Sequence, residues 1–202
     1  MKTLLTGLLV LVGMVSAAHA AGGDAAAGGQ KIAVCTACHG ADGNSMLTSF
    51  PKLAGQGQKY LIKQMIDIKA GTRNVVEMTG LLTPLNEQDF ADIAAYYSSQ
   101  KPSGGVAKAD LVEKGKGIYR AGNMATGLAA CSACHSPTGT GNVSAVFPAL
   151  AGQHADYIAS QLKKFRSGER VNDGESRMMR DIAAKLTDAE ILAVSSYIQG
   201  LR

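Results

Sequence analysis

The hydrophobic and polar positions of this chain follow the spacing of amphipathic helices, and the same arrangement occurs in both halves. Between residues 58 and 70, apolar side chains recur three and four positions apart, which predicts a helix with one buried face. Similar segments predict helices over about 24–34 and from Asn86 through Tyr97. In the second half, the predicted helices are 109–120, 154–167 and 187–199. Since no segment alternates for long enough to predict a strand, the expected fold class is all-α.

Residues typical of helix ends support these ranges. Thr187 and Glu190 have the spacing of a capping box at the start of the last helix. Gly71 is placed to end the helix that begins near residue 58. His154 has no counterpart in the first half, where Gly57 stands, and we expect it at a helix start, with a contact between domains as the alternative.

The two halves are copies of one unit. Residues 50–56 read Phe-Pro-Lys-Leu-Ala-Gly-Gln, and residues 147–153 read Phe-Pro-Ala-Leu-Ala-Gly-Gln. A period near 100 residues is that of a domain rather than of a solenoid repeat. Because Ser, Pro and Gly over 98–105 indicate a linker, we predict two tandem domains at 21–102 and 103–202. Other matched pairs are Tyr60 with Tyr157, Gln64 with Gln161, and Arg73 with Arg170.

Residues 1–20 have the features of a secretory signal peptide. Lys2 provides a basic start, an apolar stretch follows from Leu4 to Val15, and Ala18-His19-Ala20 is a small-x-small cleavage site. A membrane anchor is the alternative, but the apolar stretch is shorter than the roughly 18 residues that indicate a span. We therefore expect cleavage after Ala20 and export of the remaining chain.

All four cysteines lie in two Cys-x-x-Cys-His motifs, which are Cys35, Cys38 and His39 in the first copy and Cys131, Cys134 and His135 in the second. This pattern is that of c-type haem attachment, in which both thiols bond covalently to one porphyrin and the His is a ligand of its iron. We therefore predict two covalently bound haem c groups and no disulfide. A structural zinc site is the alternative, but the Cys pairs lie 96 residues apart and the adjacent His favours haem.

The second axial ligand of each iron is expected to be a Met, which is a common partner of His in electron-transfer haems. Met46 lies only seven residues after His39, and Met65 lies on the apolar face of a predicted helix, where Met is usually core. Met78 precedes the last predicted helix of its domain and is the only one of the three with a partner in the second copy. We predict His39 and Met78 as the axial ligands of the first haem.

In the second domain, the adjacent residues Met178 and Met179 are both candidates for the second axial ligand. Met78 precedes Leu81 by three positions and Leu85 by seven, and Met179 precedes Ile182 and Leu186 by the same intervals. Met178 does not keep that register and is the alternative. We predict His135 and Met179 as the ligands of the second haem.

A proline follows each motif His in the matched segments. A haem-ligating His usually donates its second N–H to a backbone carbonyl, and Pro51 or Pro148 could present one. A plain loop proline is the alternative, although the identical surroundings in both copies favour the functional interpretation.

Together these residues resemble the cytochrome c4 family of dihaem cytochromes. The two Cys-x-x-Cys-His motifs, the Phe-Pro-x-Leu-Ala-Gly-Gln segments and the late Met cover essentially all of residues 21–202. The resemblance implies two class I cytochrome c domains related by a pseudo-twofold axis, with Pro51 and Pro148 orienting the ligand His. It also implies a periplasmic electron carrier that accepts electrons from a quinol-oxidising complex and delivers them to a terminal oxidase, in some members loosely associated with the inner membrane.

One feature departs from the family pattern. Gly115, Ile118 and Tyr119 fit the first helix of a class I domain, whereas the first copy offers Gly29 and Ile32 without the aromatic residue. The helix packing of the first domain is therefore less firmly predicted than the iron ligands of that domain.

The predicted function is one-electron transfer without catalysis, because His and Met on both faces leave an iron no open position. The alternatives are a haem subunit of a larger dehydrogenase and a dihaem peroxidase. Residues 21–100 carry 6 basic and 7 acidic side chains, and residues 101–202 carry 13 and 9. The more positive second half should favour the reduced iron, so we expect the second haem to have the higher potential. The sequence has no dense run of Lys and Arg residues, so nothing in it suggests nucleic-acid binding.

Overall fold

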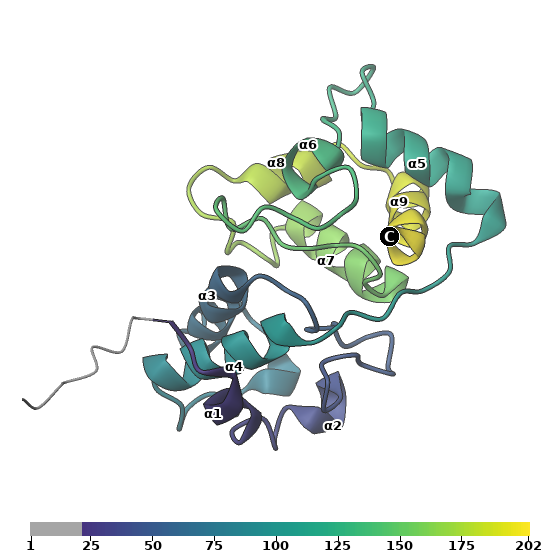
Figure 1. Cartoon of the computed structure of the whole chain (residues 1–202). Helices are drawn as coiled ribbons and strands as arrows, with labels where there is room; N and C mark the ends of the chain where they lie inside the picture. The colour runs from purple at the N-terminus through teal and green to yellow at the C-terminus, as the bar shows by residue number, and fades with distance from the viewer. Residues whose placement is uncertain (1–21) are drawn as a thin grey trace, which may run out of the picture.

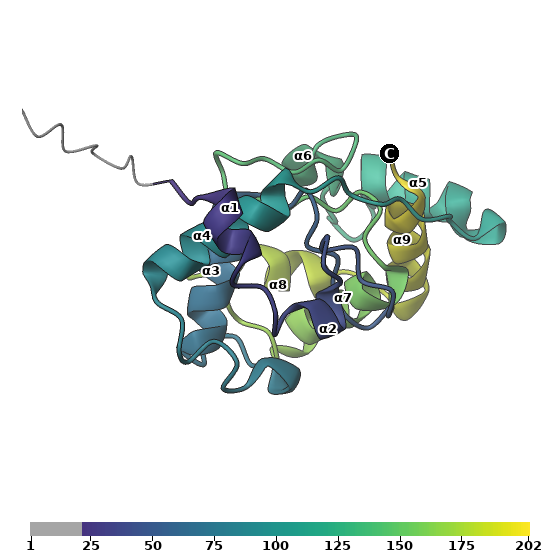
Figure 2. The same cartoon turned by 60° about the horizontal axis from the view of Figure 1, so that its bottom comes forward.

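The computed structural model describes residues 22–202, and the predicted signal peptide at 1–20 lies outside this range. Within it the chain is helical, and its only β pairing consists of two isolated bridges, so the all-α prediction is confirmed. None of the helices in the described range is both long and apolar enough to cross a membrane. Figures 1 and 2 show two clusters of helices, one from each half of the chain, packed side by side.

The helices of the two halves follow the same order. The first half contains α1 (Ala25–Gly29), α2 (Thr36–His39), α3 (Gln58–Lys69), the 3₁₀ turn η1 (Val76–Met78) and α4 (Glu87–Ser99). The second half contains η2 (Ala109–Leu111), α5 (Val112–Ala121), α6 (Ser132–His135), α7 (Ala155–Ser167), α8 (Met178–Ala183) and α9 (Asp188–Gly200).

Each half has its own hydrophobic core. In the first half, Leu61 of α3 packs with Ile93 and Tyr97 of α4, and all three side chains are less than 8% exposed. In the second half, Ile158 of α7 packs with residues of α9 such as Ile191. Full burial of such side chains stabilises a fold by about 1.5–3 kcal/mol each. The last helix of each half is therefore the element against which the others pack.

Capping residues begin the last helices as the sequence predicts. The side chain of Thr187 accepts a hydrogen bond from the backbone N–H of Glu190, and the Glu190 carboxylate accepts one from the N–H of Thr187. Asn86 and Asp89 form the same reciprocal box at the start of α4. Gly71 follows Ala70, the C-cap residue of α3, and has φ +77°, a backbone conformation that favours glycine.

The first helix is shorter than predicted. The expected helix over 24–34 ends at Gly29, because glycine is a poor helix former and two of them stand in succession here. Gly28 is also the residue at the crossing of α1 and α4: a Cβ atom there would lie 2.0 Å from the carbonyl oxygen of Asp92. In the second half, a Cβ atom added at Gly115 would lie 2.3 Å from the carbonyl oxygen of Ala193.

This contact corrects the alignment of the two copies. Gly28, rather than Gly29, is the counterpart of Gly115, so the register shifts by one residue. Ile32 then stands in the first half where Tyr119 stands in the second, and both side chains are buried. The missing aromatic residue therefore leaves the helix crossing itself unchanged.

Helix α8 was not predicted, because its stability depends on contacts beyond its own six residues. The carboxylate of Asp173 accepts hydrogen bonds from the backbone N–H of Arg180 at 2.9 Å and from Nε of the same residue at 2.7 Å. This carboxylate, seven residues earlier in the chain, satisfies an N–H at the start of the helix that has no partner within the helix.

The two halves meet in a reciprocal hydrogen-bonding pattern. The side chain of Gln56 accepts from the N–H of Ala149 at 2.8 Å and donates to its carbonyl at 2.9 Å. Gln153, the counterpart of Gln56, makes the same pair of bonds to the backbone of Lys52, both at 2.9 Å. Because the same surface is used on both sides, the halves are related by the expected pseudo-twofold axis.

The N-terminal segment of the described chain is held by a buried carboxylate. Asp92 accepts hydrogen bonds from Lys31 Nζ at 2.7 Å and from the N–H of Asp24 at 2.8 Å, and these bonds lower its pKa from 3.8 to about 2. The charged form is thus favoured by folding. The resulting stability is fully present above the unfolded-state pKa and is lost as the pH falls toward about 2.

We expect the free energy of unfolding to fall with pH in this acid range, and to fall less steeply in Asp92→Asn. Denaturant titrations between pH 5 and 2 would measure the two slopes, with the exposed Asp110→Asn as a control that keeps the wild-type slope. Equal slopes in Asp92→Asn and the wild type would contradict the role given to this carboxylate.

Candidate functional site: two haem-attachment motifs

Each Cys-x-x-Cys-His motif folds into one short turn of helix. Cys35 immediately precedes α2, which ends at His39, and Cys131 immediately precedes α6, which ends at His135. The backbone N–H of each His bonds to the carbonyl of the first Cys at 2.9 Å. The turn thereby presents the two thiols and the imidazole of a motif within one local unit.

The two imidazoles are held alike. Nδ1 of His39 lies 2.9 Å from the carbonyl oxygen of Pro51, and Nδ1 of His135 lies 2.9 Å from that of Pro148. A carbonyl oxygen only accepts hydrogen bonds, so Nδ1 carries the proton in both residues. Nε2 is then the nitrogen with a free lone pair, which is the form of imidazole that ligates metal ions.

Burial favours the same neutral form of these side chains. Both His residues are 7% exposed, and burial lowers the pKa of His39 and of His135 even though the proline carbonyls act in the opposite direction. Phe50 and Phe147 lie against the two rings, with ring centroids 6.4 and 6.2 Å apart respectively. Each imidazole is therefore neutral, oriented and shielded from water.

The first thiol of each motif faces an apolar environment. Burial raises the pKa of the Cys35 thiol and raises that of Cys131 to about 11. Tyr97 lies beside Cys35, and its hydroxyl is buried there. Apolar surroundings for the attachment thiols suit a large hydrophobic ligand.

The methionines differ in exposure. Met46 and Met124 are 92% and 96% exposed, and Met65 packs against the core of the first half. Met78 is half-buried at the end of η1 and lines a hollow of about 290 Å³. In the first turn of α8, Met179 is half-buried.

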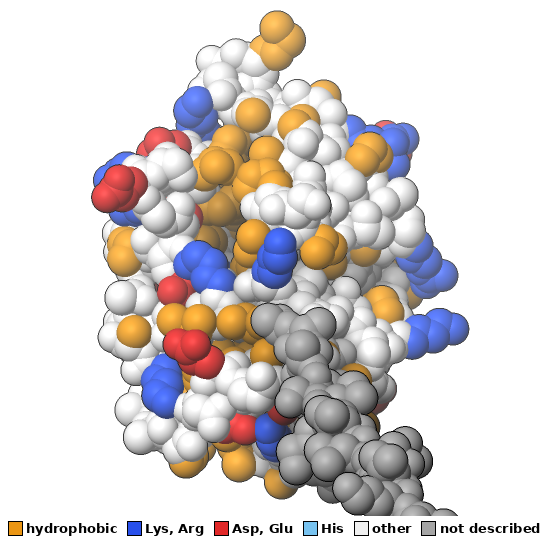
Figure 3. Space-filling view, turned by 60° about the vertical axis from the view of Figure 1, so that its left-hand side comes forward, with side chains coloured by type: hydrophobic (Ala, Val, Ile, Leu, Met, Phe, Trp, Pro, Cys, Tyr) orange, Lys and Arg blue, Asp and Glu red, His pale blue; other side chains and the backbone are white. Residues whose placement is uncertain are grey.

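The donor sets present in the structure fit haem c. Each half offers two thiols, a neutral imidazole with Nε2 free, and a partly buried thioether sulfur, which are the groups that attach and ligate this cofactor. Figure 3 shows hydrophobic side chains gathered in a recess on one face of the molecule, with charged side chains of both signs around it. An apolar recess suits the hydrophobic face of a porphyrin.

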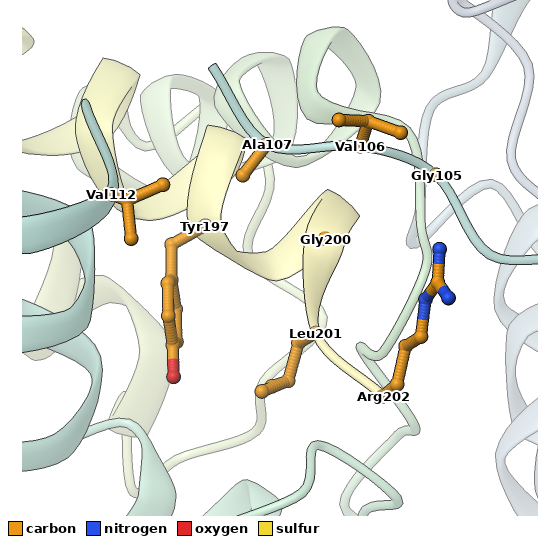
Figure 4. A pocket seen from close by; sticks show the side chains of 8 residues that line it. All are labelled: Gly105, Val106, Ala107, Val112, Tyr197, Gly200, Leu201 and Arg202. Atoms are coloured by element: carbon orange, nitrogen blue, oxygen red, sulfur yellow. The ribbon is translucent and has the colours of Figure 1, made fainter. Parts of the chain in front are cut away.

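A second hollow lies apart from both motifs. It measures about 420 Å³ and is lined by the linker at Gly105–Ala107 and by the end of α9, including Tyr197 and Leu201 (Figure 4). The linker is attached there by hydrogen bonds of 3.1 Å from the N–H of Gly105 to the Gln199 carbonyl and of 3.0 Å from the Gln199 side chain to the Val106 carbonyl. We assign no part of the haem sites to this hollow.

Sequence reasoning missed the contacts between the halves. His154 is the N-cap residue of α7, so the prediction of a helix-start residue is confirmed. Its Nε2 also lies 2.8 Å from the carbonyl oxygen of Ser45 in the other half, so the alternative of an interface contact applies as well. Arg73 and Arg170 were noted only as a matched pair, and both are buried between the halves. Their recurrence was a signal, but it did not show what they contact.

Comparison with known proteins matches both halves of the chain to cytochromes. The sequence profile of the cytochrome c family matches residues 26–101 and 112–202. Cytochrome c4 of Pseudomonas aeruginosa is 59% identical over 201 residues, which is 100% of both chains. The crystal structure of reduced cytochrome c4 from Pseudomonas stutzeri superposes with a TM-score of 0.88 at 55% identity and covers 89% of this chain and 100% of that one. The thiosulfate dehydrogenase electron acceptor of Thiomonas intermedia is 36% identical over 86% of this chain and 81% of its own.

Proposed function

The chain belongs to the cytochrome c4 family of dihaem electron-transfer proteins, and from that premise we propose that it works in the periplasm and delivers single electrons to a terminal oxidase. When bound, the two haem c groups supply the one-electron redox chemistry. A quinol-oxidising complex is the proposed donor.

The proposed haem-binding residues come in two matched sets. Cys35 and Cys38 would hold the first haem, with His39 and Met78 as axial ligands. In the second half, the attachment residues would be Cys131 and Cys134, and the axial ligands His135 and Met179. Pro51 and Pro148 would orient the two imidazoles through their carbonyl oxygens.

The observation that carries the proposal is the pair of identically oriented imidazoles. Their Nδ1 protons are donated to Pro51 and Pro148, so the ligand nitrogen cannot rotate away from the site. If Met78 and Met179 supply the remaining ligands, no coordination position would be left for a substrate, and each site would pass electrons without binding peroxide.

Spectroscopy of the holoprotein tests this function. We expect both irons to be low-spin and six-coordinate, to titrate as one-electron centres, and to leave hydrogen peroxide unconsumed. A high-spin iron or peroxide turnover would favour the dihaem peroxidase instead.

The partner is tested separately. The second candidate function is electron transfer with a dehydrogenase, because the chain is 36% identical to an electron acceptor of thiosulfate dehydrogenase. Reduced protein should be oxidised by membranes that contain a terminal oxidase. If the protein were instead reduced only by a dehydrogenase that copurifies with it, that result would support the second candidate.

The proposed organisation of the chain is a signal peptide at 1–20 and domains at 21–102 and 103–202. The absence of the cytochrome c profile between residues 101 and 112 supports a boundary in this region. The mass of the exported protein would test the cleavage after Ala20.

A further inference from the structure

Each half buries one tyrosine beside the first cysteine of its motif, but different helices supply the two rings. In the first half the residue is Tyr97 of α4, which is 1% exposed and lies in the core cluster that packs against Cys35. In the second half it is Tyr119 of α5, which is fully buried in the cluster that packs against Cys131. The ring therefore belongs to the last helix in one half and to α5, the first long helix, in the other.

The two halves have exchanged an aromatic and an aliphatic side chain. Ile198 of α9 is the counterpart of Tyr97, because residues of the last helix are offset by 101 between the copies. Ile32 is the counterpart of Tyr119, and all four side chains are buried. Each half thus holds one Tyr and one Ile at these two positions, in opposite arrangements.

The exchange preserves an aromatic pair beside each motif. The rings of Tyr96 and Tyr97 have centroids 5.3 Å apart and are inclined at 69°. Those of Tyr119 and Tyr197 have centroids 5.6 Å apart and are inclined at 48°. Both separations lie in the range of favourable aromatic contacts, so ring packing is served equally by either arrangement. The halves differ instead in where the buried hydroxyl group lies.

The two buried hydroxyl groups have different neighbours. Tyr119 donates to the carbonyl oxygen of Ser136 at 2.8 Å. The Tyr97 hydroxyl lies at the sulfur of Cys35, and no other described residue offers it a hydrogen-bond partner. Burial raises the pKa of both tyrosines, so each hydroxyl keeps its proton and is a donor. Because a buried donor without an acceptor is costly, the sulfur is the acceptor that the fold provides for Tyr97.

We propose that the Tyr97 hydroxyl donates a hydrogen bond to the Cys35 sulfur in the thioether of the first haem, and that the second haem has no such bond. The inference rests on the proposed attachment of a haem through Cys35 and Cys38. A thioether sulfur keeps its lone pairs and remains a weak acceptor. The bond places the positive end of the O–H dipole at the point of attachment. Because positive charge disfavours the oxidised iron, Tyr97 raises the potential of the first haem.

Removal of the hydroxyl alone tests this bond in the holoprotein. Tyr97→Phe keeps the ring and loses the donor, so the midpoint potential of the first haem should fall and that of the second should not change. Tyr96→Phe is the matched control, because its hydroxyl belongs to the same aromatic pair but donates to the Ala41 carbonyl at 3.0 Å. Neither this variant nor Tyr119→Phe should change the potential of the first haem.

Vibrational spectroscopy tests the bond without a substitution. Resonance Raman spectra of the wild-type holoprotein in H2O and in D2O would compare the C–S stretching bands of the thioethers. A component from the first haem should shift in D2O, because deuteration of the donor changes the hydrogen bond to the sulfur. The shift should be absent in Tyr97→Phe and retained in Tyr96→Phe.

Two results would overturn the inference. One is a first-haem potential in Tyr97→Phe that equals the potential in Tyr96→Phe. The other is a set of wild-type C–S bands that is identical in the two solvents. A failure of the proposed function would be seen separately, since the mass of the holoprotein reports two covalently bound haems and low-spin spectra report their ligation, whichever residue stands at position 97.

Discussion

Replacement of Gly115 with Ala should destabilise the holoprotein by about 1–3 kcal/mol, the usual cost of forcing extra volume into a packed core. The new Cβ atom would lie 2.3 Å from the carbonyl oxygen of Ala193 and 2.6 Å from the Cβ of Tyr197, and neither neighbour is the movable end of a flexible side chain. Helix α5 would have to move away from α9, the helix against which the second core packs. Denaturant unfolding of the holoprotein would measure the loss.

The same helix supplies the control for this prediction. A Cβ atom added to Gly117 meets nothing within 4 Å. Gly117→Ala should therefore be neutral or stabilise the protein by up to about 1 kcal/mol, since Ala is the better helix former. Equal stability of the two variants would show that the close crossing of α5 and α9 is not what requires glycine at 115.

Replacement of Met179 with Ala should remove the Met-ligated spectrum of one haem and leave the other intact. Met179 is half-buried and keeps the register of Met78, whereas Met178 is 42% exposed. Without the thioether, the potential of the second haem should fall, because a Met ligand raises the potential of a c-type haem. The red absorption band of Met-ligated ferric haem should drop to half its intensity.

Met178→Ala is the matched control, since it removes the same side chain one residue earlier. It should keep the full band and both potentials. If Met178→Ala lost the band and Met179→Ala kept it, the assignment by register would be wrong. Met78→Ala should give the same loss of half the band, at the first haem.

Local patterns account for much of what the sequence predicted. The helices α3, α4, α7 and α9 begin and end within about two residues of their predicted positions, because hydrophobic spacing and capping residues act over a few residues. The capping box at Thr187 and Glu190 is an example that needs no distant partner. The reciprocal Gln56 and Gln153 contacts, in contrast, appear only once the halves are placed together.

The sequence-based predictions failed where contacts outside a local segment determine the structure. The predicted counterpart of Gly115 was wrong, because the position of the crossing glycine depends on where the carbonyl of Asp92 lies. Helix α8 was missed because the carboxylate of Asp173 supplies its N-terminal partner. The first case depends on residues far apart along the chain, and the second on a carboxylate seven residues before the N–H that it accepts from.

The sequence by itself determined the all-α class, the duplication and the two haem-attachment motifs. These depend on short-range spacing and on covalent chemistry that a few adjacent residues perform. Only the tertiary structure decided that Pro51 and Pro148 accept the imidazole protons and that Arg73 and Arg170 are buried where the two halves meet. The reason is physical: orientation, burial and charge compensation are properties of surroundings, and distant segments create those surroundings when the two halves pack.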